Sequence, residues 1–102
     1  MTVPKYDFQL FVTGHTPRSE AAIRNLRRIC DEALGGECRV EVVDVLEHTE
    51  SADREQVLVT PTLIKRSPLP AARIAGDLSD AQMVLGILGL EVEDGGFDDG
   101  GY

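Results

Sequence analysis

A proline between two threonines, at Thr60-Pro61-Thr62, is the feature that most constrains the fold of this chain. It lies between a polar, helix-like run and a short apolar run that begins at Leu63. Because proline has no N–H to give to a sheet ladder, Pro61 belongs at the start of a strand or on a sheet edge. An X-Pro bond is also the one place where a cis peptide costs little, and a cis bond here would redirect the chain sharply.

The first half of the chain predicts a strand, a helix and a second strand. Residues 6–12 alternate apolar and polar side chains until Phe11, which indicates a half-buried strand that becomes fully buried near its end. Thr16 is a good N-cap for a helix that begins at Pro17 and continues to about residue 34, with apolar side chains at three- and four-residue steps. After two glycines, residues 38–46 form the second strand, and the two strands should be parallel.

The second half predicts shorter elements. The polar run 47–56 indicates one short helix capped at Thr49, and a third strand follows Pro61. After a rigid turn at 67–70, residues 72–75 form a short returning strand. Ser79 and Gln82 form a capping box at the start of a last helix. Four side chains of this helix are expected to face inward: Met83, Val84, Ile87 and Leu88. The fold class is α/β, and the order β-α-β-α-β-β-α resembles the thioredoxin-like fold.

The length and the charge indicate one domain with an acidic tail. A chain of 102 residues can build one modest core, which we assign to residues 1–90. Residues 91–102 carry five acids and no base, so we expect them to be disordered. The net charge of −8 argues against a nucleic-acid partner. No apolar run approaches the roughly 18 residues of a membrane span, and residues 1–5 have no signal-peptide core, so we expect a cytoplasmic protein.

Catalytic signals are weak. In a thioredoxin the loop after the first strand carries the reactive dithiol, but here residues 13–17 contain no thiol. Cys30 and Cys38 lie elsewhere and form no CxxC motif, and Cys30 lies on the apolar face of the first helix. His15 and His48 are isolated histidines without metal-site spacing. We therefore predict no catalytic residue, no cofactor and no metal, although His15 occupies the loop where the dithiol would lie.

The remaining class of function is binding to another molecule. Basic side chains occur on the first helix and near the predicted hairpin, and they give an acidic protein one basic side: Arg24, Arg27, Arg28, Lys65, Arg66 and Arg73. This side is either an ordinary solvated face or an electrostatically steered protein interface.

Five segments resemble the KaiB family of circadian clock proteins in order and spacing. The resemblance covers about residues 8–90 and is carried by 10–19, 43–46, 60–63, 68–70 and 73–79. It implies a non-enzymatic clock component that binds the hexameric ATPase ring KaiC. It also implies a switch between an oligomeric ground-state fold, commonly tetrameric, and a thioredoxin-like monomer that binds the ring. Further partners implied are a KaiA-like protein and a clock histidine kinase, since the sensor domain of the kinase SasA shares the fold.

The resemblance leaves the site and the switch as predictions. We expect the partner to bind the second strand and the first helix, through Arg24, Arg27 and Arg28 with Arg39 and Glu41. Residues 47–90 should have two competing folds, because Gly86 and Gly89 each weaken a helix by roughly 1 kcal/mol relative to alanine. Slow X-Pro isomerisation would supply a slow step in the exchange, at Pro61, Pro68 and Pro70. The alternative is a redox or stress-response protein on a thioredoxin-like frame.

Overall fold

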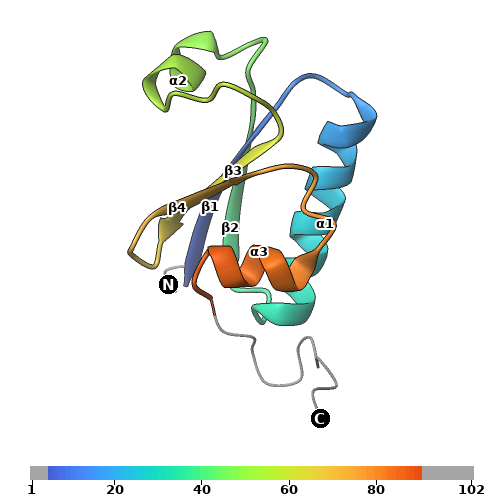
Figure 1. Cartoon of the computed structure of the whole chain (residues 1–102), viewed down its shortest axis with the longest axis vertical. Helices are drawn as coiled ribbons and strands as arrows, with labels where there is room; N and C mark the ends of the chain where they lie inside the picture. Colours follow the sequence, from blue (N-terminus) through green and yellow to red (C-terminus); the bar gives the residue numbers. More distant parts are fainter. Residues whose placement is uncertain (1–4, 91–102) are drawn as a thin grey trace.

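The computed structural model describes residues 5–90, which form a four-stranded mixed sheet with helices on both faces (Figure 1). The order β-α-β-α-β-β-α agrees with the prediction. The elements are β1 Tyr6–Val12, α1 Pro17–Ala33, β2 Cys38–Asp44, α2 Thr49–Arg54, β3 Thr62–Ser67, β4 Ala72–Ala75 and α3 Ala81–Ile87. The predicted tail, residues 91–102, lies outside the described residues.

The sheet has the strand order β2-β1-β3-β4, so β2 and β4 are its edges. β1 is parallel to β2, as predicted, and antiparallel to β3. Pro61 immediately precedes β3, where its missing N–H disturbs no ladder, and its carbonyl accepts a hydrogen bond from Gly76 N at 2.9 Å. The peptide bonds before Pro61, Pro68 and Pro70 are cis. The role of these prolines in a change of fold stays a prediction.

Local sequence signals explain the bounds of α1. The Thr16 hydroxyl accepts a hydrogen bond from Ser19 N at 3.2 Å, and Pro17 occupies the first turn. The helix ends where Gly35 and Gly36 adopt φ values of 68° and 75°, which side chains disfavour. The predicted apolar face is confirmed, and its buried hydrophobic members are Ala22, Leu26, Ile29, Cys30 and Ala33.

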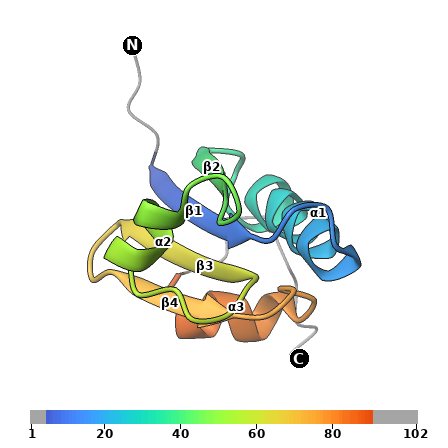
Figure 2. The ribbon, with the colours of Figure 1, turned by 90° about the horizontal axis from the view of Figure 1, so that it is seen from above.

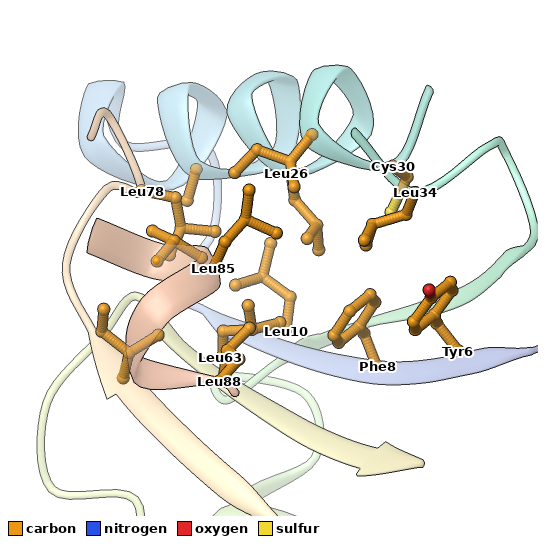
Figure 3. Close-up of a cluster of buried hydrophobic side chains, with 14 of the residues drawn as sticks. Tyr6, Phe8, Leu10, Leu26, Cys30, Leu34, Leu63, Leu78, Leu85 and Leu88 are labelled. Carbon is orange, nitrogen blue, oxygen red and sulfur yellow. The ribbon is translucent and has the colours of Figure 1, made fainter. Parts of the chain in front are cut away.

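β1 contributes to two cores, one on each face of the sheet. Its alternate side chains pack under α1 and α3 in the main core (Figure 3), which contains Tyr6, Phe8, Leu10, Leu26, Leu63, Leu85 and Leu88 among others. On the opposite face a smaller cluster contains Phe11, Val43, Ala52 and Ile64. Ala52 belongs to α2, which lies over the sheet away from α1 (Figure 2). The fold therefore has three layers. The sheet is the middle layer, and β1 contributes side chains to the core on each of its faces.

Three predicted boundaries are wrong. β2 ends at Asp44, because the Asp44 carbonyl accepts from Glu47 N and His48 N in a turn. The N-cap of α2 is His48, and Thr49 is already helical. The N-cap of α3 is Asp80, whose carboxylate accepts from Met83 N at 3.1 Å, so the expected capping box of Ser79 and Gln82 does not start this helix.

The buried face of α3 is offset from the predicted one. Each residue turns a helix by about 100°. Val84 and Leu88 are buried as predicted, and Leu85 joins them in the main core. Met83 and Ile87, which were expected to face inward, are half exposed.

Gly89 terminates α3 and does not weaken it as predicted. Its φ is 69°, and it follows the C-cap residue Leu88. Gly89 N donates to Gly86 O at 3.1 Å, and Leu90 N donates to Leu85 O at 2.9 Å. This pair of bonds is the Schellman motif, which satisfies helix carbonyls that would otherwise lack partners.

Candidate partner-binding surface

The loop between β1 and α1 holds a histidine that is paired with an acidic side chain of α1. The His15 side chain is 94% exposed, and its Nδ1 lies 3.0 Å from Glu20 Oε2. The hydrogen bond with Glu20, followed by the charge of the same carboxylate, raises the pKa of His15. The partner of His15 is thus an acid that stabilises its protonated form. This arrangement is an exposed ion pair.

Substitution of Glu20 by glutamine is expected to lower the pKa of His15, because the amide keeps a hydrogen-bonding oxygen but removes the charge. In the wild-type chain the contact favours the folded state while His15 is protonated, and this contribution is lost as the pH rises through the His15 pKa. An NMR titration of the His15 imidazole in both chains measures the change. An unchanged pKa would mean that the two side chains do not pair in solution.

Hydrogen bonds join three segments at the end of the sheet where β1 and β2 finish and β3 begins. The Asp44 carboxylate at the end of β2 accepts from Gly14 N at 3.1 Å and Leu46 N at 2.9 Å, and these two bonds lower the pKa of Asp44. The hydroxyls of Thr13 and Thr60 share a hydrogen bond. The loop after β1, the turn after β2 and the segment before β3 therefore form one continuous surface, at the top of Figure 1.

Exposed apolar side chains gather on this surface. Leu58 is 92% exposed, and Leu46 and Val59 are also exposed. A hollow of about 160 Å3 adjoins Leu58 and Val59, and its lining is Thr13, Val45, Val57, Leu58, Val59 and Thr60. We call Leu46, Leu58 and Val59, with this hollow, the apolar end. Grouped exposed apolar side chains are typical of contact sites. The sequence analysis missed this group, although the apolar run 57–59 next to Pro61 could have indicated it.

The structure separates the predicted partner-binding residues. Arg24, Arg27 and Arg28 are exposed on α1. Arg39 and Glu41 are exposed on β2, but they pair in register with Asp7 and Gln9 and so project from the sheet face opposite α1. Arg27 alone of the three arginines lines a hollow with β2, whose volume is about 350 Å3 and whose lining is Arg27, Cys30, Asp31, Gly36, Cys38 and Val40.

One basic residue of the hairpin is buried and does not belong to the expected basic surface. Lys65 is 1% exposed, and its ammonium donates to the carbonyl of Leu88 at the end of α3. Arg73 donates to the carbonyls of Glu55 and Gln56, at 2.8 and 3.5 Å, just after α2. Both side chains therefore join helices to the sheet. Lys65 is therefore withdrawn from the predicted basic side, whereas Arg73 stays exposed while it is tied to the residues after α2.

A line of polar side chains crosses the sheet face that α2 covers in part. Gln9 donates to Glu41 at 2.9 Å and accepts from Arg66. The Arg66 guanidinium also pairs with Glu55 at 2.9 Å, and this bond lowers the pKa of the Glu55 carboxyl. Glu55 is the C-cap of α2, so the line connects the β2 edge to that helix. Glu41 is thus partly committed to an intramolecular contact.

The thiols lie at the other end of the sheet. Cys38 starts β2 and pairs with Tyr6 at the start of β1, whereas the loop that lacks the dithiol follows Val12 at the end of β1. Neither cysteine is in a disulfide. Among residues 5–90 no cluster of three or more His, Cys, Asp or Glu side chains could hold a metal ion. In the same range no helix has the length and apolar character needed to cross a bilayer.

Comparison with known families gives one consistent match. A family model described as the KaiB domain matches residues 9–90. The chain is 46% identical over 92 residues to the circadian clock protein KaiB3 of Synechocystis sp., covering 90% of this chain and 88% of that protein. It is 41% identical over 87 residues to the circadian clock oscillator protein KaiB of Synechococcus elongatus, covering 85% and 83%.

Solved structures show the fold. The N-terminal domain of SasA from Synechococcus elongatus superposes with a TM-score of 0.69 at 20% identity, covering 84% of this chain and 82% of that one. Mitochondrial thioredoxin 3 from Saccharomyces cerevisiae superposes with a TM-score of 0.66 at 17% identity, covering 84% and 79%. The expected thioredoxin-like fold is confirmed.

Proposed function

The chain belongs to the KaiB family of circadian clock proteins, and on this premise we propose that it binds a KaiC-like hexameric ATPase ring without catalysing a reaction itself. The observation that carries the proposal is the apolar end. Where a thioredoxin has its dithiol, this chain has a thiol-free loop beside the exposed Leu58 and Val59. Such a surface suits contact with another protein better than chemistry. One copy binds each subunit of the ring.

The proposed contact combines the apolar end with the exposed side of α1 and the edge of β2. Leu46 follows β2 directly, and its Cδ1 lies 3.7 Å from the position that a Cβ on Gly14 would take. The loop that contains Gly14 leads into α1, so the three parts adjoin. In this arrangement the apolar side chains supply most of the affinity. Arg24, Arg27 and Arg28 supply long-range attraction to an acidic partner surface.

The variant Leu58→Ser is expected to weaken ring binding by about tenfold, mainly through faster dissociation, because truncation of a central apolar contact costs more than 1 kcal/mol. The side chain is almost fully exposed, so the fold should be unaffected. Surface plasmon resonance on the immobilised ring measures both rates. Leu69→Ser is the matched control, since Leu69 is also exposed but lies in the β3–β4 turn. Equal effects of the two substitutions would contradict the assignment of the apolar end.

Replacement of Arg24, Arg27 and Arg28 by alanine is expected to slow association several-fold at low salt and to flatten its salt dependence. The matched control replaces the same three residues by lysine, which keeps the charge. The association rate is measured by stopped flow at several ionic strengths. If the alanine variant associates at the wild-type rate at every ionic strength, α1 is not part of the contact.

The fold that binds the ring is part of the proposal. The described form has the thioredoxin-like order, which the family resemblance assigns to ring binding. We propose that it exchanges slowly with an oligomeric form in which residues 47–90 are rearranged. The helices of this half are short, six residues in α2 and seven in α3, and helices of this length depend on tertiary packing. A KaiA-like protein and a clock histidine kinase are proposed as further partners, and the cytoplasm as the location.

A further inference from the structure

We propose that Cys30 and Cys38 form a reversible intramolecular disulfide that ties the last turn of α1 to the start of β2, with a small-molecule disulfide such as oxidised glutathione as the oxidant. The two thiols lie far from the loop in which a thioredoxin would carry its dithiol. They would therefore act as a redox-sensitive site of this chain and not as a disulfide reductase.

The backbone between the two cysteines folds back on itself. Gly35 and Gly36 both have positive φ values, and Gly36 N donates to the carbonyl of Cys30 at 2.8 Å. This bond closes a tight loop between Cys30 and Gly36. Glu37 O then accepts from Tyr6 N at 3.0 Å, which fixes the entry into β2 one residue before Cys38. Both cysteines thus lie on hydrogen-bonded backbone, on either side of one short loop.

The side chains share one environment. Cys30 and Cys38 line the same hollow of about 350 Å3 between α1 and β2. Cys30 is part of the main core, where Figure 3 shows it next to Leu34, and Cys38 packs against that core. Hydrogen bonding with the Cys38 side chain, followed by burial, raises the pKa of Cys30. The two thiols therefore line one hollow, and the deeper one has a raised pKa.

The difference in burial sets the order of the reaction. Cys38 is partly exposed, whereas Cys30 is buried. The Cys38 thiolate attacks one sulfur of oxidised glutathione, which forms a mixed disulfide and releases a glutathione thiolate. Once Cys38 is in the mixed disulfide, its thiolate no longer opposes ionisation of Cys30. The released glutathione thiolate takes the Cys30 proton, and the Cys30 sulfur attacks the Cys38 sulfur, which releases the second glutathione thiolate. The two protons from the cysteine thiols end on the two glutathione molecules. The protein pair is oxidised, and one glutathione disulfide is reduced to two thiols.

The test uses the full chain, reduced and then incubated with oxidised glutathione at neutral pH. Intact-mass spectrometry should show a loss of two hydrogens, about 2 Da, without a glutathione adduct. The variant Cys30→Ser should keep one glutathione on Cys38, because the resolving thiol is missing. The variant Cys38→Ser should remain unmodified while folded, because Cys30 is buried. Circular dichroism of each variant establishes that it is folded.

Three results would overturn the proposal. One is a wild-type chain that accumulates glutathione adducts as Cys30→Ser does. Another is a wild-type chain that stays reduced under conditions in which Cys30→Ser is modified. The third is a disulfide that links two chains, seen as a dimer on a non-reducing gel. The wild-type result decides the question even if one of the variants fails to fold.

Discussion

Replacement of Phe8 by alanine is expected to lower the free energy of unfolding by about 3–5 kcal/mol. The Phe8 ring is 1% exposed in the main core, and it stacks against the Tyr6 ring with centroids 6.4 Å apart. A cavity at this position would remove the stack on Tyr6 and open a gap in the main core. Because small domains are stable by only about 5–15 kcal/mol, the variant should be near its folding threshold. Urea denaturation followed by circular dichroism measures the loss.

Phe11→Ala is the matched substitution, since the same ring is removed from the same strand three residues further on. Phe11 is also fully buried, but it belongs to the smaller cluster under α2. We expect its main effect to be local, with α2 opening while β1 and α1 remain protected. Amide hydrogen exchange distinguishes the two results. Equal loss of protection throughout the chain in both variants would mean that the two cores unfold as one unit.

Gly86→Ala and Gly89→Ala are expected to shift the stability of α3 in opposite directions. Gly86 is inside α3, and a Cβ added there would meet nothing within 4 Å, so alanine should stabilise the helix by about 0.5–1 kcal/mol. Gly89 has a φ of 69°, where alanine costs about 1–2 kcal/mol. The two variants should therefore differ by about 2 kcal/mol, which is roughly thirtyfold in an equilibrium constant.

If the thioredoxin-like form exchanges with a second form, this difference should appear in their populations. Two-dimensional amide NMR at several protein concentrations would show more of the thioredoxin-like peaks in Gly86→Ala and fewer in Gly89→Ala. A single set of peaks in both variants, unaffected by dilution or by the ring ATPase, would contradict the proposed exchange. The difference in unfolding free energy would then remain as a separate test of the Schellman motif.

The first half of the fold could be predicted from sequence because several local signals agree there. In α1 the cap at Thr16, the proline after it, the apolar periodicity and the glycines at its end all indicate the same helix. β1 shows both of its cores in its sequence, since alternation buries one face and Phe11 adds the other. When local signals agree in this way, tertiary packing rarely changes the secondary structure that they predict.

The second half was less predictable because its signals compete. Asp80 and Ser79 are both good N-caps one residue apart, so the sequence leaves the start of α3 ambiguous by one residue. The role of Gly89 depends on where that helix ends, which short helices do not determine locally. Lys65 was expected at the surface because lysine is rarely buried. Only the packed structure brings its ammonium to the carbonyl of Leu88.

The candidate surface was predicted in part. Charged positions can be read from the sequence, but the face to which they project cannot be read before the strand register is known. The register places Arg39 and Glu41 on the face opposite α1, away from Arg24 and Arg28. The apolar run 57–59 could have indicated part of the apolar end, but the hollow beside it depends on three segments that meet only in the folded chain.

The burial of Lys65 determines how the chain responds to amine-directed chemistry. The chain has two lysines, of which Lys5 is exposed at the start of β1 and Lys65 is enclosed beneath α3. An acylating reagent reaches Lys65 only when α3 leaves the sheet. The ratio of the two acylation rates, both read in the same molecule, therefore reports how often that helix opens. A rearrangement of residues 47–90 that moves α3 off the sheet would therefore increase acylation of the Lys65 amine.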